Sequence, residues 1–159
     1  MTVDQTRDIL KTDQVAQQLL GSPSIARLAY TWRDGSPRVV PMWFQWTGED
    51  ILMGAPPNSP KMKVLSARPQ VAVSIDSSDW PYKWLNLRGT ASVQVSSEPF
   101  AEYLAMARRY LGDVGGEQFL TALRQTFHGW ARIAIRPNEV RILDFEGRFP
   151  SAWSAGARS

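Results

Sequence analysis

The alternation of apolar and polar residues divides the chain into a helical start, a strand-rich middle and a helical segment before the last strands. Apolar residues near helical spacing predict an amphipathic helix over residues 4–20, which Gly21 and Pro23 end. Two-residue alternation bounded by turn signals then predicts strands. These cover residues 25–32, 38–46, 51–54, 71–75 and 82–95.

Turn and helix signals separate the strands. Asp34-Gly35 is typical of a hairpin turn, and 47–50 is a second turn. A short helix is expected over 60–67, with Ser59 as its N-cap and Pro60 at its first position. The strands on either side of each turn are therefore expected to be antiparallel neighbours.

Helical spacing returns after Ser96. Apolar residues predict one helix that Gly112 closes and a second over about 116–127. Residues 130–136 and 139–145 alternate again and are expected to form a strand pair bent at Pro137-Asn138. The whole pattern predicts a mainly β protein, an antiparallel barrel with helical insertions. No linker or repeat divides it, so residues 1–159 are expected to form a single domain.

Composition narrows the classes of protein. The chain is 43% apolar and 21% charged, which is ordinary for a globular domain, and no apolar run approaches the length of a membrane span. The N-terminus has no signal-peptide pattern. There is no cysteine, which excludes disulfides, thiolate metal sites and cysteine nucleophiles and fits a reducing, cytoplasmic location.

Charge and histidine content limit the chemistry further. The 18 basic and 15 acidic residues give +3 and a pI near 9.5, with the charges spread along the chain. A basic stripe typical of nucleic-acid binding is not visible, so neither nucleic acid nor membrane is expected as a partner. His128 is the single histidine and is expected at a helix end rather than in catalysis.

Most catalytic and metal motifs are missing from the sequence, including GxGxxG, HExxH and GxSxG. The acid pairs Glu49/Asp50 and Asp76/Asp79 lie in turn-like sequence and lack the spacing of a calcium loop. No metal site is therefore expected, and the sequence assigns no catalytic acid or base.

One segment indicates phosphate binding. Ser59, Lys61 and Lys63 lie where a strand leads into a helix. Free backbone N–H groups and the positive end of the helix dipole favour anions there, and the hydroxyl and ammonium groups add donors. The alternative is a capped surface helix with two solvated lysines.

A second segment lies just upstream and could form an apolar wall against a flat ring. It consists of Arg38, Val39, Val40, Pro41, Met42 and Trp43. Pro41 places this strand at an edge or bulge, where unpaired backbone groups could bind a planar heterocycle. The alternative is a strand whose bulky residues only pack the core.

Together these segments resemble the pyridoxamine 5′-phosphate oxidase-like family, the split-barrel proteins that bind flavins or deazaflavins. In that family a serine and lysine spaced as Ser59 and Lys61 bind the FMN phosphate, and an Arg-x-Val stretch at the position of residues 38–43 lines the flavin. Residues 87–91 are similar to a late barrel strand of the family. Trp43 stands where the family has a lysine. The histidine and arginine residues with which the true oxidase binds pyridoxamine phosphate are not evident. The deazaflavin branch also has a lysine at the position of Lys61.

The resemblance implies a homodimeric split β-barrel that transfers hydride between FMN or the deazaflavin coenzyme F420 and a small organic substrate. The cofactor would lie at the dimer interface, and Trp80, Trp84 and Trp153 are the candidates to complete it from the second chain. The alternative from another class is a barrel that binds a flavin, a haem or another tetrapyrrole without turnover.

Overall fold

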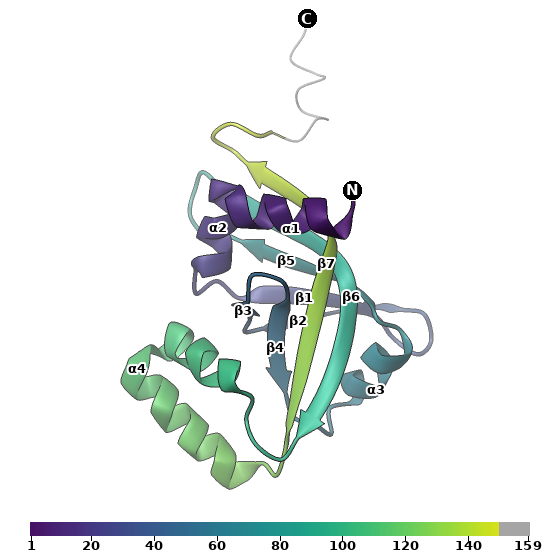
Figure 1. Ribbon diagram of the computed structural model, residues 1–159, viewed down its shortest axis with the longest axis vertical. Helices are drawn as coiled ribbons and strands as arrows, with labels where there is room; N and C mark the ends of the chain where they lie inside the picture. The colour runs from purple at the N-terminus through teal and green to yellow at the C-terminus, as the bar shows by residue number, and fades with distance from the viewer. Residues whose placement is uncertain (150–159) are drawn as a thin grey trace, which may run out of the picture.

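A computed structural model describes residues 1–149 as one curved antiparallel sheet with helices around it (Figure 1). Its helices are α1 (Val3–Thr12), α2 (Gln14–Gly21), α3 (Pro60–Ala67) and α4 (Ala101–Thr126). Its strands are β1 (Ala26–Thr31), β2 (Pro37–Met42), β3 (Gln45–Trp46), β4 (Ile51–Ala55), β5 (Gln70–Asp76), β6 (Lys83–Ser96) and β7 (Trp130–Asp144).

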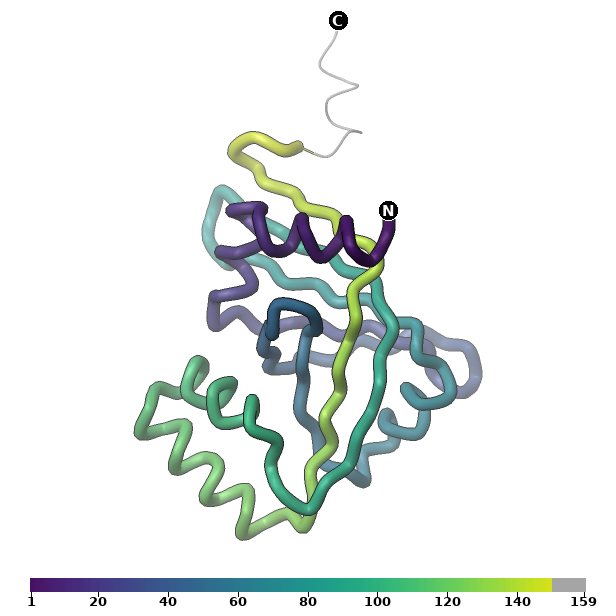
Figure 2. The backbone as a smooth tube through the Cα atoms, viewed as in Figure 1, coloured from purple at the N-terminus to yellow at the C-terminus, as the bar shows by residue number. Residues whose placement is uncertain are grey.

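The seven strands run in the order β2-β1-β5-β6-β7-β4-β3, and every neighbouring pair is antiparallel. Strands β6 and β7 run side by side along a long bend that curls the sheet (Figure 2). The predicted fold class, an antiparallel split β-barrel, is confirmed. The hairpin turn at Gly35 and the turn at Gly48 are also confirmed, and both glycines have positive φ.

The last strand differs from the prediction. Residues 130–144 form one strand rather than a pair bent at Pro137-Asn138. Pro137 lies opposite Gly89 of β6, where the register of the β6–β7 ladder shifts. A Cβ on Gly89 would lie 2.5 Å from the carbonyl oxygen of Arg136, so this position leaves no room for a side chain. The proline is therefore absorbed by a bulge instead of ending the strand.

Two other elements differ in the opposite way and are broken where the sequence predicted continuity. The helix over 4–20 is two helices, because Asp13 leaves the helical conformation and caps α2 with its carboxylate. The strand over 38–46 ends at Met42 and resumes at Gln45. By contrast, the helix over 60–67 is confirmed at its predicted bounds, and the predicted helical pair is α4, kinked at Gly112 with φ 78°.

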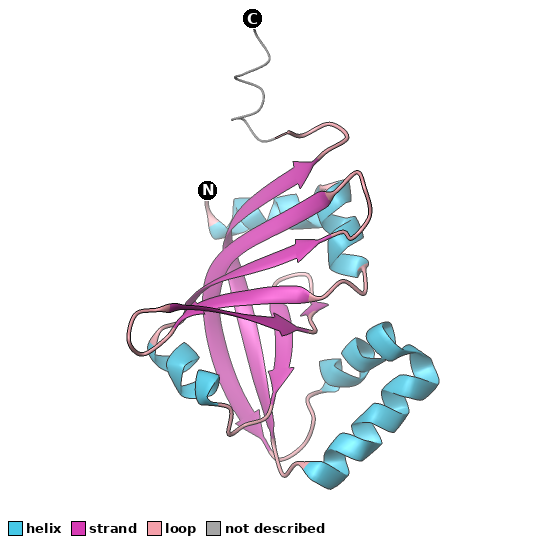
Figure 3. Ribbon diagram, turned by 180° about the vertical axis from the view of Figure 1, so that it is seen from behind, coloured by secondary structure: helices cyan, strands magenta, loops and turns pink. Residues whose placement is uncertain are grey.

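The core fills the inside of the curved sheet. Helices α1 and α2 close one end of it and α3 lies near the β1–β2 hairpin, while α4 forms a separate helical hairpin against β3 and β4 (Figure 3). The largest fully buried side chains include Phe44, Leu10, Leu28 and Leu85. None of the helices described in residues 1–149 is both long and apolar enough to cross a bilayer.

Candidate functional site

The start of α3 carries two polar groups without partners. Ser59 occupies the N-cap position as predicted, but its hydroxyl makes no capping bond and has no hydrogen bond within residues 1–149. Lys61, in the first turn, has no hydrogen bond or ion pair in the same range. Pro60 between them has no N–H to offer. Both side chains are only partly exposed, so this helix start is not a simple solvated cap.

Burial has an electrostatic effect at Lys61. Desolvation lowers the pKa of its ammonium, and no carboxylate within the described residues offsets that. Lys63, two positions on, is exposed. A half-buried ammonium without a counter-charge is stabilised by any anion that reaches it. The pair Ser59 and Lys61 thus fits the phosphate that the sequence predicted there.

Strand β2 lies at an edge of the sheet and pairs only with β1, as Pro41 indicated. Pro37 and Pro41 cannot donate, so their pairs with β1 are the ones without ladder hydrogen bonds. Because the pairs alternate, Val39 has the same orientation. The free edge therefore presents the carbonyl oxygens of these three residues and a single N–H donor, that of Val39.

The turn of the β1–β2 hairpin lies beside α3 and its C-terminal end, so the two predicted segments belong to neighbouring elements (Figures 1 and 3). The Arg68 guanidinium donates to the carbonyl oxygen of Arg33 over 3.1 Å. Arg33 and Arg38 both lie over the ring of Trp32, 5.5 and 5.4 Å from its centroid. A shallow hollow between hairpin and helix is lined by Arg33, Lys63, Val64, Ala67 and Arg68.

Positive charge is concentrated here. We call the following five residues the cationic cluster: Arg33, Arg38, Lys61, Lys63 and Arg68. None of them forms an ion pair within residues 1–149, whereas most arginines elsewhere in that range are paired with a carboxylate. The sequence suggested evenly spread charge, whereas folding brings Arg33, Lys63 and Arg68 to one hollow. It also places Arg33 and Arg38 over the same ring, that of Trp32.

Trp43 lies away from α3 and packs under α4. Its ring stacks on Tyr110 at 4.9 Å and 5°, and contacts Phe119 at 5.0 Å. Val40 and Met42 turn inward and pack against the core. The predicted ring-lining segment is thus divided between Arg38 at the hairpin, the free edge in the middle and Trp43 at α4.

The other singled-out residues lie elsewhere. Trp80 is 68% exposed on the β5–β6 loop, and the Trp84 indole donates to the Ser74 hydroxyl over 2.8 Å. Trp153 lies outside the described residues. His128 is exposed between α4 and β7.

Three of the four residues in the acid pairs form ion pairs with arginines. Asp76 pairs with Arg27, while Asp50 and Glu49 pair with Arg136. Within residues 1–149, no group of three histidine, aspartate or glutamate side chains is placed to hold a metal ion.

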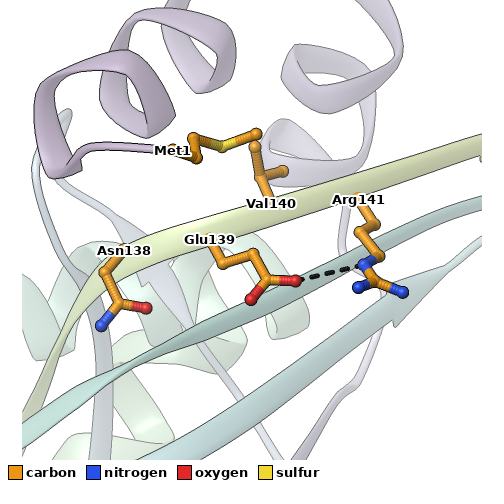
Figure 4. Close-up of a pocket in the computed structure, with 5 residues that line it drawn as sticks. All are labelled: Met1, Asn138, Glu139, Val140 and Arg141. Atoms are coloured by element: carbon orange, nitrogen blue, oxygen red, sulfur yellow. Dashed lines mark hydrogen bonds and ion pairs between the residues drawn. The ribbon is translucent and has the colours of Figure 1, made fainter.

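A hollow on β7, lined by Met1, Asn138, Glu139, Val140 and Arg141, contains none of the predicted site residues (Figure 4). The Glu139 carboxylate there accepts from Arg141 Nε over 3.1 Å and from Arg88 over 3.4 Å. The charged side chains of this hollow are thus already paired, with one another or with Arg88.

Two sets of residues were missed from the sequence. Arg33 and Arg68 border a turn and a helix end, where no motif singles them out. Arg109 and Tyr110 were expected only as part of an amphipathic helix, yet both bond the main chain of the β2–β3 junction. Their long-range partners leave no local pattern in the sequence.

Comparison with solved structures finds the same fold in several proteins. An F420 reductase is 28% identical, with a TM-score of 0.61, 79% of this chain covered and 94% of that chain. A conserved hypothetical protein from Mycobacterium tuberculosis is 21% identical, with a TM-score of 0.68 and coverage of 84% and 85%. The haem storage protein HutZ from Vibrio cholerae is 16% identical, with a TM-score of 0.60 and coverage of 82% and 93%.

No curated protein matches the sequence. Residues 12–144 match the family described as pyridoxamine 5′-phosphate oxidase. That range runs from the end of α1 to the end of β7 and includes both segments singled out in the sequence. The chain therefore belongs to the pyridoxamine 5′-phosphate oxidase family.

Proposed function

We propose that the protein is an oxidoreductase that transfers hydride between a bound flavin or deazaflavin coenzyme and a small organic substrate. Ser59, Lys61 and Lys63 hold the phosphate of the coenzyme, and residues 38–43 hold the ring through the β2 edge. The coenzyme supplies the redox chemistry, while the protein binds and orients it. The similarity to an F420 reductase supports this class of function.

The observation that carries the proposal is Lys61. Its ammonium is partly buried, has its pKa lowered by desolvation and has no anionic partner within residues 1–149. A structural lysine in that position would be expected to reach a carboxylate or water. An anionic ligand removes the cost of burial, and the unbonded hydroxyl of Ser59 supplies a further donor.

The β2 edge supports the ring position. A planar heterocycle that carries both acceptors and donors matches an edge with one N–H and several carbonyl oxygens. The prolines at 37 and 41 also prevent another strand from adding to this edge. The edge therefore stays free for a ligand.

The cationic cluster favours the more anionic coenzyme. Ser59, Lys61 and Lys63 suffice for a single phosphate, whereas Arg33 and Arg68 extend the positive surface along the hairpin. Surplus cations stabilise a ligand with several negative groups and accelerate its association. We therefore favour F420 over FMN.

The second candidate is a carrier of haem or another tetrapyrrole without turnover. Similarity to the haem storage protein HutZ, at 16% identity, concerns the fold alone. The single histidine, His128, is exposed on the turn before β7. The absence of cysteine from the sequence removes the other common strong axial ligand.

We further propose that the protein acts as a homodimer, with aromatic residues such as Trp80 available to the second chain. Light scattering of the purified protein tests this. A monomer at micromolar concentration would contradict it.

Titration of the purified protein with FMN, F420 and haemin, followed by absorption and fluorescence, tests the function. We expect F420 to bind more tightly than FMN and its affinity to fall more steeply with salt, because more charges are screened. Reoxidation of reduced coenzyme by candidate substrates then tests turnover. Binding of haemin alone would support the carrier, and binding of none of the three would contradict both functions.

A further inference from the structure

The helical hairpin α4 is fixed to the rest of the molecule by two adjacent side chains. The Tyr110 hydroxyl donates to the carbonyl oxygen of Ser24 over 2.8 Å and accepts from the Phe44 N–H over 3.2 Å. The Arg109 guanidinium donates to the carbonyl oxygen of Phe44, to Gln45 Oε1 over 3.2 Å and to the carbonyl oxygen of Leu20 over 3.4 Å. Two residues of one helix thus hold the end of α2, the start of β1 and the β2–β3 junction.

Phe44 is central to this arrangement because it lies in the gap between two strands. Its N–H bonds Tyr110, its C=O bonds Arg109, and its ring lies under the guanidinium at 4.5 Å. The side chain is fully buried. A buried main-chain segment outside the ladder needs such partners, so α4 replaces the hydrogen bonds that the broken strand lacks.

The guanidinium itself has no carboxylate within residues 1–149. Within that range its charge is balanced by main-chain and side-chain oxygen atoms and by the faces of the Phe44 and Tyr110 rings. One of the carbonyl oxygens lies at the C-terminal end of α2, where the helix dipole favours a cation. Its Nε is buried without a partner. A partly buried charge of this kind has a role beyond filling space, since an apolar side chain of similar volume would avoid the cost of burying it.

Trp43 connects this anchor to the ring-binding edge. It directly follows β2 and stacks on the Tyr110 ring, so the main chain from Met42 to Phe44 is held on both sides by α4. We propose that Arg109 and Tyr110 are positioning residues that set the free edge of β2 against the coenzyme ring. The role in positioning the coenzyme rests on the proposed function, whereas the anchoring of β2 by α4 does not.

Tyr110→Phe tests the anchor because it removes the hydroxyl and keeps the ring stack. Tyr103→Phe is the matched control, since it makes the same change on the same helix and its hydroxyl has no hydrogen bond within residues 1–149. We expect Tyr110→Phe to accelerate amide hydrogen exchange about tenfold at Val40, Met42 and Phe44, as loss of such bonds allows local opening. Exchange at Val73 and Leu87 in the sheet centre should not change.

Coenzyme binding provides the second measurement. Tyr110→Phe should weaken binding of whichever coenzyme the unmodified protein takes by about tenfold, while Tyr103→Phe leaves it within twofold. Arg109→Lys keeps the charge but loses the planar guanidinium with its several donors, and it should weaken binding as well. This variant replaces Tyr110→Phe if the latter does not fold.

Equal effects of the two tyrosine variants on exchange would overturn the inference. Faster exchange with unchanged affinity would retain the anchor and reject its role in positioning. If the unmodified protein binds neither coenzyme, the proposed function fails and exchange alone decides on the anchor.

Discussion

The ring of Tyr103 lies directly against the backbone of Gly54, where a Cβ atom would overlap the ring. Gly54 belongs to β4 and Tyr103 to the first half of α4. Tyr103 also meets Trp130 edge to face at 5.1 Å, so the ring has little room to retreat. This glycine therefore permits α4 to dock on the sheet.

Gly54→Ala should lower the free energy of unfolding by about 1–3 kcal/mol, the usual cost of overpacking a close contact. Gly21→Ala is the control, because nothing lies within 4 Å of a Cβ there and its φ is not positive. Urea unfolding of both variants measures the difference. Equal stabilities would mean that α4 shifts to accommodate the methyl group without cost.

Gly89→Ala should be more damaging than Gly54→Ala. The added Cβ would meet the carbonyl oxygen of Arg136, a main-chain atom of the neighbouring strand, rather than the end of a side chain. The bulge in the β6–β7 ladder would have to rearrange, and the pairing of many residues depends on that bulge. We expect a drop in melting temperature larger than that of Gly54→Ala, measured by circular dichroism. The reverse order would show that the bulge adapts more easily than the α4 contact.

Local signals were sufficient for most of the fold. Gly35 and Gly48 mark turns because both adopt the positive φ that glycine allows. Ser59-Pro60 marks the start of α3 because these residues suit the backbone conformation of a helix N-terminus. The edge position of β2 followed from Pro41 for the same reason. The strands themselves could be predicted from the alternation of apolar and polar residues, because successive residues of a strand face opposite sides of the sheet.

The errors arise where distant contacts outweigh local preference. Pro137 does not end a strand, because Asn138 beside it is the extra residue of a bulge in β7. Gly89, far along the chain, leaves room for the close approach opposite it. Asp13 interrupts a helical pattern for a local reason as well, since its carboxylate caps α2 by accepting from Val15 and Ala16. Its ion pair with Arg148 adds a distant contact. The start of α3 could be singled out from Ser59 and Lys61, but the cationic cluster could not, since Arg33 meets Lys63 and Arg68 only in the folded chain.

Asp13 should make stability depend on pH. Burial alone would raise the pKa of its carboxyl, but Arg148 at 2.6 Å and the N–H groups of Ala16 and Val15 outweigh burial and lower it. The folded pKa thus lies below the unfolded value near 3.9. The stabilisation is complete above the unfolded pKa and is lost as pH falls through the folded pKa.

We therefore expect Asp13→Asn, which keeps a capping oxygen but not the charge, to flatten the decline of stability between about pH 5 and pH 2. Asp13→Ala should also remove the cap, at a cost of about 1 kcal/mol at pH 7. Asp8→Asn, at an exposed position on α1, is the control. Unfolding measured across this pH range would contradict the prediction if Asp13→Asn and the unmodified protein lost stability in parallel.

Lys61→Met should separate binding from stability. In the free protein the lysine carries a cost of burial, expressed in its lowered pKa, so an apolar side chain of similar length should leave the melting temperature unchanged or raise it. The same change should weaken coenzyme binding by about 1.5–3 kcal/mol, the usual value of a hydrogen bond to a charged group. Lys11→Met, at an exposed position on α1, should alter neither. Thermal melts and titrations of the two variants test both halves. A destabilised Lys61→Met protein with unchanged affinity would mean that this lysine belongs to the fold and not to the site.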